Sequence, residues 1–260
     1  MKRITTILAV IGLFALTSCD FFLQKPDTTG TVDRDAVFST QKNAEAALMS
    51  CYANALVHGL PGGLGYTHGT LGAISGEINR GASWHGTYFI AQQGLNVNGA
   101  GSDATDSSNG SSAGSENWAK NWSVIRQCYI VKENIDMVQD LTDDEKAVIK
   151  AEVTALVAYR YMGMFYRYGG VPIVTRSFEA SDDLTAGRVS LEETLQHIID
   201  LCDEAHAGLP AKWDAANTGR MTQGAVLAIK ARALMFAARP LFNSATPYLD
   251  NGSLNDLICF

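Results

Sequence analysis

The chain has little charge and lacks the usual cysteine and histidine patterns of metal sites. Only 18% of its 260 residues are charged and the formal net charge is −7, which disfavours nucleic acid as a partner. The five cysteines form no CxxC pair, so neither a zinc ribbon nor a dense disulfide framework is encoded. No HExxH motif is present, and we expect no metal or cofactor. Apart from Cys19, the cysteines are expected to be mostly buried.

Beyond its first residues, the chain also has no apolar run of membrane-spanning length. Residues 1–18 combine two basic residues with a short apolar stretch, which is typical of an export signal. Two small residues precede Cys19 and complete a lipobox, in which that cysteine is acylated; several acyl chains hold a protein on a membrane durably. We therefore predict a signal peptide over 1–18, a lipidated Cys19 and an extended tether over 19–37. A plain secretory signal or an uncleaved anchor helix is the alternative.

Apolar residues recur at helical spacing in five segments. The clearest start signals are two capping boxes, Thr142 with Glu145 and Ser190 with Glu193. The first helix is expected to begin at Ser39 or Thr40 and to end before Gly59. We expect the others over about 116–139, 143–168, 190–207 and 222–239.

The same patterns predict which helix faces are buried. The helix over 143–168 is apolar nearly all round after Val153, so we expect burial on several sides. Trp118 and Trp122 stand at helical spacing and are expected in the core, whereas His197 and His206 are expected on a helix surface. In the last helix, small residues leave room for close helix contact: Ala225, Ala228, Ala231, Ala237 and Ala238.

Five helices without alternating strands predict a mostly α fold. The helices follow one another in pairs, 116–139 with 143–168 and 190–207 with 222–239, like helical-hairpin repeats. A strict 34-residue period is absent, so the repeat cannot be established from spacing alone. Residues 59–115 are rich in Gly, Ser and Asn, and we expect them to form a long ordered loop inserted in this scaffold.

Several strings, together with the lipobox, resemble the SusD/RagB family of surface lipoproteins from glycan-degrading Gram-negative bacteria. They are VTALVAYR over 153–160, YGGVP over 168–172, GRMT over 219–222, AIKARAL over 228–234 and PLFN over 240–243. The resemblance implies a tetratricopeptide-like scaffold whose loops bind oligosaccharide. It also implies a lipid anchor in the outer membrane, facing the cell exterior, and a SusC-like TonB-dependent transporter as partner.

Members of that family are substantially longer than this chain. We therefore expect residues 38–260 to be an incomplete N-terminal helical domain, apparently truncated at the C-terminus. The helix over 222–239 is then expected to expose an apolar face, because a repeat without its neighbour cannot bury its surface.

Carbohydrate binding needs flat aromatic rings and polar groups in a concave site. The loop over 59–115 supplies both, and the resemblance implies ligand contacts from this part of the chain. We assign the candidate ligand contacts by composition and location to Arg80, Trp84, Tyr88, Asn96 and Asn98. The alternative is that Trp84 and Tyr88 pack beneath the loop as a small separate core.

Signs of catalysis are weak. A GxSxG string at 110–114 lacks the preceding strand and following helix that a nucleophile elbow requires. The acidic pairs 182–183 and 192–193 do not suit a glycosidase, since neighbouring side chains point apart. We predict a non-catalytic glycan-binding lipoprotein that delivers oligosaccharides to the transporter. The alternatives are a helical scaffold fragment that docks on the transporter without binding sugar and, less favoured, a surface glycoside hydrolase.

Overall fold

The computed structural model describes residues 34–56, 118–179, 181–244, 247–248 and 250–260. All regular elements in these ranges are helices, which confirms the mostly α prediction. They are α3 (Arg34–Val37), α4 (Gln41–Leu56), α7 (Trp118–Asn134), η3 (Ile135–Met137), α8 (Asp143–Tyr168), α9 (Leu191–Gly208), α10 (Gln223–Ala237) and η4 (Gly252–Leu257). The short helix α3 lies where we expected the end of an extended tether.

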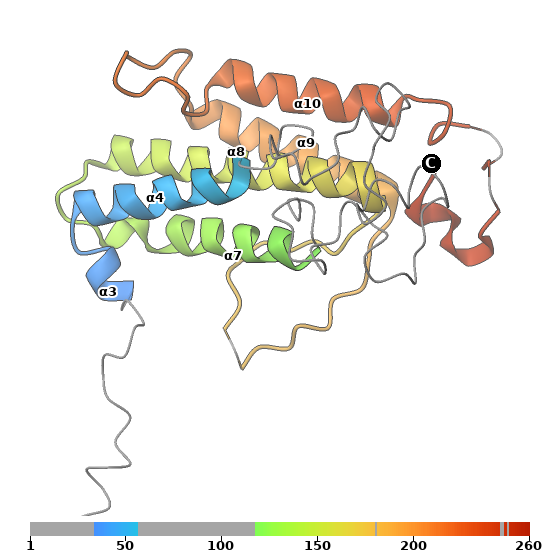
Figure 1. Ribbon diagram of the computed structural model, residues 1–260, viewed down its shortest axis with the longest axis horizontal. Coiled ribbons are helices and arrows are strands. Elements are labelled where there is room, and N and C mark those ends of the chain that lie inside the picture. The colour runs from blue at the N-terminus through green and yellow to red at the C-terminus, as the bar shows by residue number, and fades with distance from the viewer. Residues whose placement is uncertain (1–33, 57–117, 180, 245–246, 249) are drawn as a thin grey trace, which may run out of the picture.

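Helix α8 is the centre of the bundle. It contacts α4, α7, α9 and α10, and Figure 1 shows α7 and α10 on opposite sides of it. Its buried residues run almost without a break from Ala151 to Phe165, as the apolar pattern predicts. Burial on all sides is possible because a helix satisfies its own backbone hydrogen bonds.

The two predicted capping boxes are both present. In α8, the Glu145 backbone N–H donates to Thr142 Oγ1 at 3.3 Å and the Thr142 N–H donates to the Glu145 carboxylate at 2.8 Å. In α9 the reciprocal bonds between Ser190 and Glu193 measure 3.1 and 2.9 Å. These hydrogen bonds satisfy donors that the first helical turn leaves free, and they lower the pKa of both glutamates.

Helix α8 ends at a glycine that no other residue can replace without strain. Gly169 has φ +73°, and a Cβ there would lie 2.0 Å from the carbonyl oxygen of Leu257. The next residue, Gly170, donates its backbone N–H to the same oxygen at 2.8 Å. The YGGVP string therefore ends the central helix and holds the 250–260 segment against it.

The contact face of α10 differs from the one predicted from its alanines. Its buried residues are Val226, Ile229, Ala233 and Ala237. Three alanines that we expected at a helix contact are exposed instead: Ala228, Ala231 and Ala238. The larger Val226 and Ile229 turn toward the core, because they remove more apolar surface from water than alanine does.

The predicted exposed apolar face of α10 is confirmed. Leu227, Leu234 and Met235 are 51%, 41% and 74% exposed. In the part of the chain that the structure describes, no helix is both long and apolar enough to cross a membrane.

Candidate functional site

A groove of about 600 Å³ lies between the first turns of α7 and the segment that leads from α8 to α9. Its size is in the range of small-molecule sites. Aromatic and charged side chains line it together: Trp118, Trp122, Arg126, Phe178, Glu179 and Asp183.

The two tryptophans form the aromatic wall of this groove. Trp118 is 39% exposed, and its ring meets Trp122 edge-on at 5.2 Å and Tyr168 at 5.0 Å between centroids. Trp122 is partly buried against Tyr161. The expectation that Trp118 lies in the core is therefore wrong. Helical spacing places both rings on one face of α7. Trp118 stands in the first turn of the helix, where that face borders the groove instead of the core.

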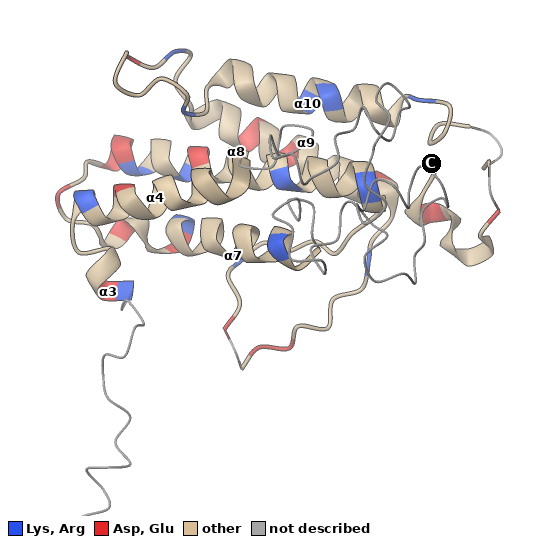
Figure 2. Ribbon diagram, viewed as in Figure 1, with Lys and Arg blue, Asp and Glu red and all other residues tan. Residues whose placement is uncertain are grey.

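The polar groups of the groove are held by neighbouring residues. Arg126 donates from Nε to the carbonyl oxygen of Phe178 at 2.8 Å, and Glu179 pairs with Arg34 of α3. Asp183 accepts two hydrogen bonds from Thr185, at 2.6 and 2.9 Å. Those bonds lower the pKa of the Asp183 carboxyl, so it is an ionised acceptor at neutral pH. Figure 2 shows the acidic residues along this loop below α7.

The loop wall of the groove is tied to the helices behind it. Tyr161 of α8 donates its hydroxyl to the Pro172 carbonyl at 3.2 Å and accepts from the Val174 N–H at 2.8 Å. Burial raises the pKa of Tyr161, which keeps this hydroxyl protonated. On α7, Glu133 accepts hydrogen bonds from the Ser177 N–H at 2.8 Å and from its hydroxyl. The groove is therefore preorganised, which lowers the cost of binding a ligand.

A second polar cluster is buried inside the bundle and is structural. Glu152 of α8 is fully buried and accepts hydrogen bonds from Tyr52 of α4 at 2.6 Å and from Arg220 Nε at 2.7 Å. Tyr52 also accepts from the Met221 N–H at 2.8 Å, and Arg220 packs over the Trp213 ring at 4.2 Å. This cluster fixes the GRMT string against the core.

Arg160 gives the VTALVAYR string a structural role. Its side chain is 2% exposed, and Nη1 donates to the Ala55 carbonyl at 3.2 Å near the C-terminus of α4. A cation at that position interacts favourably with the helix dipole. Two of the five strings that carried the resemblance, VTALVAYR and GRMT, thus each supply an arginine that binds a buried group of a neighbouring helix.

The predicted lipidation site, Cys19, lies outside the described residues, and so do the five candidates from the loop: Arg80, Trp84, Tyr88, Asn96 and Asn98. Their assignment remains a prediction. Of the acidic pairs, Asp182 binds Arg176 at 2.9 Å while Asp183 binds Thr185, so the neighbours do point apart. Within the described ranges, no group of three or more His, Cys, Asp or Glu residues is arranged to hold a metal.

His197 does not lie on the helix surface as we expected. Its ring meets Tyr161 edge-on at 4.6 Å, and its Nε2 is buried without a hydrogen-bond partner. The helical pattern of α9 places His197 next to the buried Ile198, and the packing of the Tyr161 ring of α8 against the imidazole is what the pattern could not show. Burial lowers the pKa of His197.

Sequence reasoning missed the groove because its two walls are distant in the chain. The spacing of the tryptophans indicated only a helix face. A second signal that could have indicated the groove is Phe178, an aromatic residue beside the acidic Glu179 in a segment with no helical period. Only the packing of that loop against α7 brings the two signals together.

Comparison by sequence connects this geometry to a known family. Residues 72–235 match the model of a SusD-like family that is described as starch-binding and associating with the outer membrane. This match covers most of the chain, including α7, α8 and α9. The search of curated protein sequences finds no match.

Solved structures of SusD-like proteins share the fold. A SusD-like protein from Bacteroides fragilis matches with a TM-score of 0.54 and 22% identity over 78% of this chain and 36% of that protein. Surface glycan-binding protein A from Bacteroides thetaiotaomicron, solved with laminarihexaose, matches with 0.54 and 16% over 76% and 39%. The protein of the same name from Bacteroides uniformis gives 0.58 and 18% over 75% and 42%. The chain therefore spans less than half the length of these proteins.

Proposed function

The chain belongs to the SusD-like family of starch-binding proteins that associate with the outer membrane, and we propose from this that it binds oligosaccharides at the cell surface without cleaving them. In this proposal Cys19 carries the lipid anchor, the body faces the cell exterior, and bound sugar passes to a SusC-like TonB-dependent transporter.

The groove beside α7 is the observation that carries this proposal. Pyranose rings present apolar C–H faces that stack on aromatic rings, while their hydroxyls need donors and acceptors. Trp118 offers an exposed aromatic surface, and Arg126 and Asp183 lie in the same groove. A relative of the same fold was solved with laminarihexaose, so we propose a hexose oligosaccharide as ligand.

The segment over 59–115 is proposed to supply a second set of contacts. Arg80, Trp84, Tyr88, Asn96 and Asn98 combine the same aromatic and hydrogen-bonding groups. Substituting Trp84 and Trp118 separately tests whether one or both regions contact the ligand.

The carboxylates near the groove support binding over hydrolysis. A glycosidase needs a carboxylic acid that is still protonated near neutral pH, which requires a raised pKa. The pKa values of Asp182 and Asp183 are instead lowered, by the Glu179 N–H and Arg176 for the first and by Thr185 for the second. Neither is suited to protonate a leaving sugar.

The experiment is calorimetric titration of the chain with laminarihexaose and maltohexaose. Trp118→Ala is expected to weaken binding about 3- to 10-fold, the value of one aromatic contact. Tyr248→Ala is the matched control, because Tyr248 is 71% exposed and does not line the groove. Unchanged affinity in Trp118→Ala would contradict the groove assignment.

Two further outcomes distinguish the alternatives. Chromatography of the incubated sugars is expected to show no shortened products, and their appearance would favour a glycoside hydrolase. Transporter binding without affinity for any sugar would favour the scaffold function, for which the exposed apolar face of α10 is the supporting observation.

A further inference from the structure

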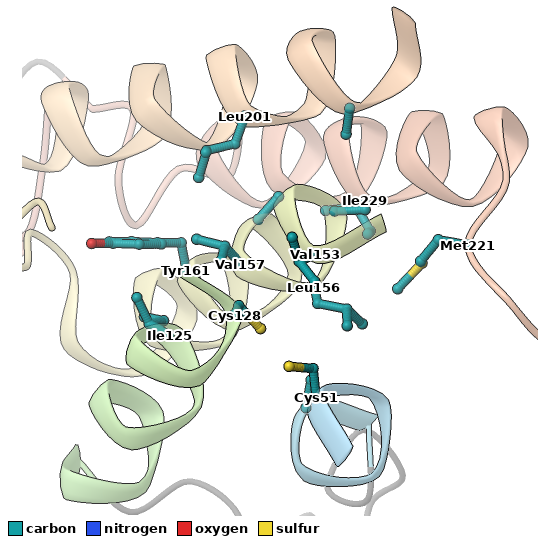
Figure 3. Packing of buried hydrophobic residues seen from close by; sticks show 14 of the residues in the cluster. Cys51, Ile125, Cys128, Val153, Leu156, Val157, Tyr161, Leu201, Met221 and Ile229 are labelled. Atoms are coloured by element: carbon teal, nitrogen blue, oxygen red, sulfur yellow. The ribbon is translucent and has the colours of Figure 1, made fainter. Parts of the chain in front are cut away.

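Two cysteines from different helices face each other in the core. Cys51 lies on α4 and Cys128 on α7, and both are fully buried. Figure 3 shows their sulfur atoms pointing toward one another across the space between the two helices. The Cys51 thiol lies close enough to raise the pKa of the Cys128 thiol, and α4 and α7 pack directly on each other.

The other described cysteines do not share this arrangement. Cys202 is buried on α9, whereas Cys259 is partly exposed in the 250–260 segment. A spacing of 77 residues separates Cys51 from Cys128, so nothing in the sequence pairs them. The pairing arises only from the packing of α4 against α7.

We propose that Cys51 and Cys128 form a disulfide bond in the exported protein and join α4 covalently to α7. Disulfides persist in the oxidising space outside the bacterial cytoplasm, where the family's outer-membrane association places its members. One protein thiolate attacks an external disulfide, forms a mixed disulfide with one of its halves and releases the other half as a thiol. The second protein thiolate then attacks the protein sulfur of this mixed disulfide and releases the remaining external thiol. Two protons and two electrons leave the pair, and one external disulfide is reduced to two thiols.

The burial of the pair indicates when the bond forms. The neighbouring Cys51 thiol and burial together raise the pKa of Cys128. A thiol that is protonated and inaccessible reacts slowly. We therefore expect oxidation while the helices are docking during folding, and slow oxidation of the folded, reduced protein.

The bond would connect the two ends of the segment that precedes α7. Residues 52–127 lie between the two cysteines, including the five loop residues proposed to contact ligand. Closing so long a loop restricts the unfolded chain and stabilises the folded one. We expect the melting temperature to be about 5–10 °C higher in the oxidised than in the reduced protein.

The test uses the full chain, unfolded and reduced, then refolded with oxidised glutathione. Trypsin digestion without reductant followed by mass spectrometry is expected to find fragment 43–80 joined to fragment 127–132, which contain Cys51 and Cys128. The fragments are expected to separate on reduction. Oxidised glutathione added to the already folded, reduced protein should give at least tenfold less of this product in the same time.

The controls separate this pair from general thiol reactivity. Cys202→Ala is expected to leave the joined fragments unchanged, whereas Cys128→Ala abolishes them. Refolded protein in which both fragments carry free or glutathionylated thiols would overturn the pairing, whether or not the variants fold. A second sample, purified from cells that make the chain with its own leader, tests the compartment: a disulfide after refolding but free thiols in this sample would overturn the proposal that the bond forms in the exported protein.

Discussion

Glu152 is a carboxylate in a stretch of helix that is otherwise almost entirely apolar. It is fully buried, and its charge is balanced by Arg220, whose pKa is raised by the hydrogen bond between them. Removing one partner of such a pair leaves a buried charge without compensation, which costs more than the pair contributes. The sequence showed both residues but not their meeting, because 68 positions separate them.

Replacing Glu152 by Gln is therefore expected to lower the free energy of unfolding by about 3 kcal/mol. Urea unfolding followed by circular dichroism measures this. The matched control is Glu204→Gln, which breaks the surface pair with Lys132, where Glu204 is 55% exposed. That change is expected to cost less than about 1 kcal/mol, and equal losses in the two variants would contradict the structural role of the buried cluster.

His197 makes the stability depend on pH. Burial lowers its folded-state pKa, and Asp200 and Glu204 offset this only in part. Below about pH 6.5, the usual histidine pKa, the unfolded chain binds more protons than the folded one. Stability is then expected to fall as the pH drops from 6.5, and to level off below the folded pKa.

Urea midpoints between pH 5 and 8 check this expectation. His197→Phe is expected to reduce the loss of stability below pH 6.5, because the variant lacks the imidazole that is protonated more readily in the unfolded chain. His206→Phe, on the same helix, is the control and should keep the wild-type profile. A wild-type slope that persists in His197→Phe would assign the pH dependence to another group.

At the scale of elements, helix boundaries were predictable where the sequence carries a local signal for them. Caps are local, so Thr142 and Ser190 could be identified from the residues three positions beyond them. The helix expected over 116–139 instead ends at Asn134 and continues as the short η3. Its apolar residues continue through Val138, which is buried although it is extended. Burial alone does not show whether a residue is helical.

The cap of α9 provides a test at this scale. Ser190→Ala removes the hydrogen bond to the Glu193 N–H and is expected to lower the unfolding free energy by about 1 kcal/mol. Ser190→Asp retains an acceptor at the same position and is expected to lose much less. Thermal unfolding followed at 222 nm measures both variants, and similar losses would show that the cap hydrogen bond is not what stabilises this end.

At the scale of the whole molecule, the fold class followed from helical periodicity, but the candidate site did not. The pattern of each helix is contained in its own residues, whereas the groove depends on how the 172–186 loop settles against α7. Trp118 illustrates the difference, because its spacing fits a core position equally well. The candidates in 59–115 came from composition alone and fall outside the described residues.

The outer side of α10 has a consequence for how this polypeptide behaves in a test tube. Leu227, Leu234 and Met235 form a solvent-exposed apolar stripe on the surface of the folded protein. Such stripes adhere to one another and to plastic, dyes and mild surfactants. The preparation will therefore scatter more light as it is concentrated, and a nonionic surfactant will disperse it.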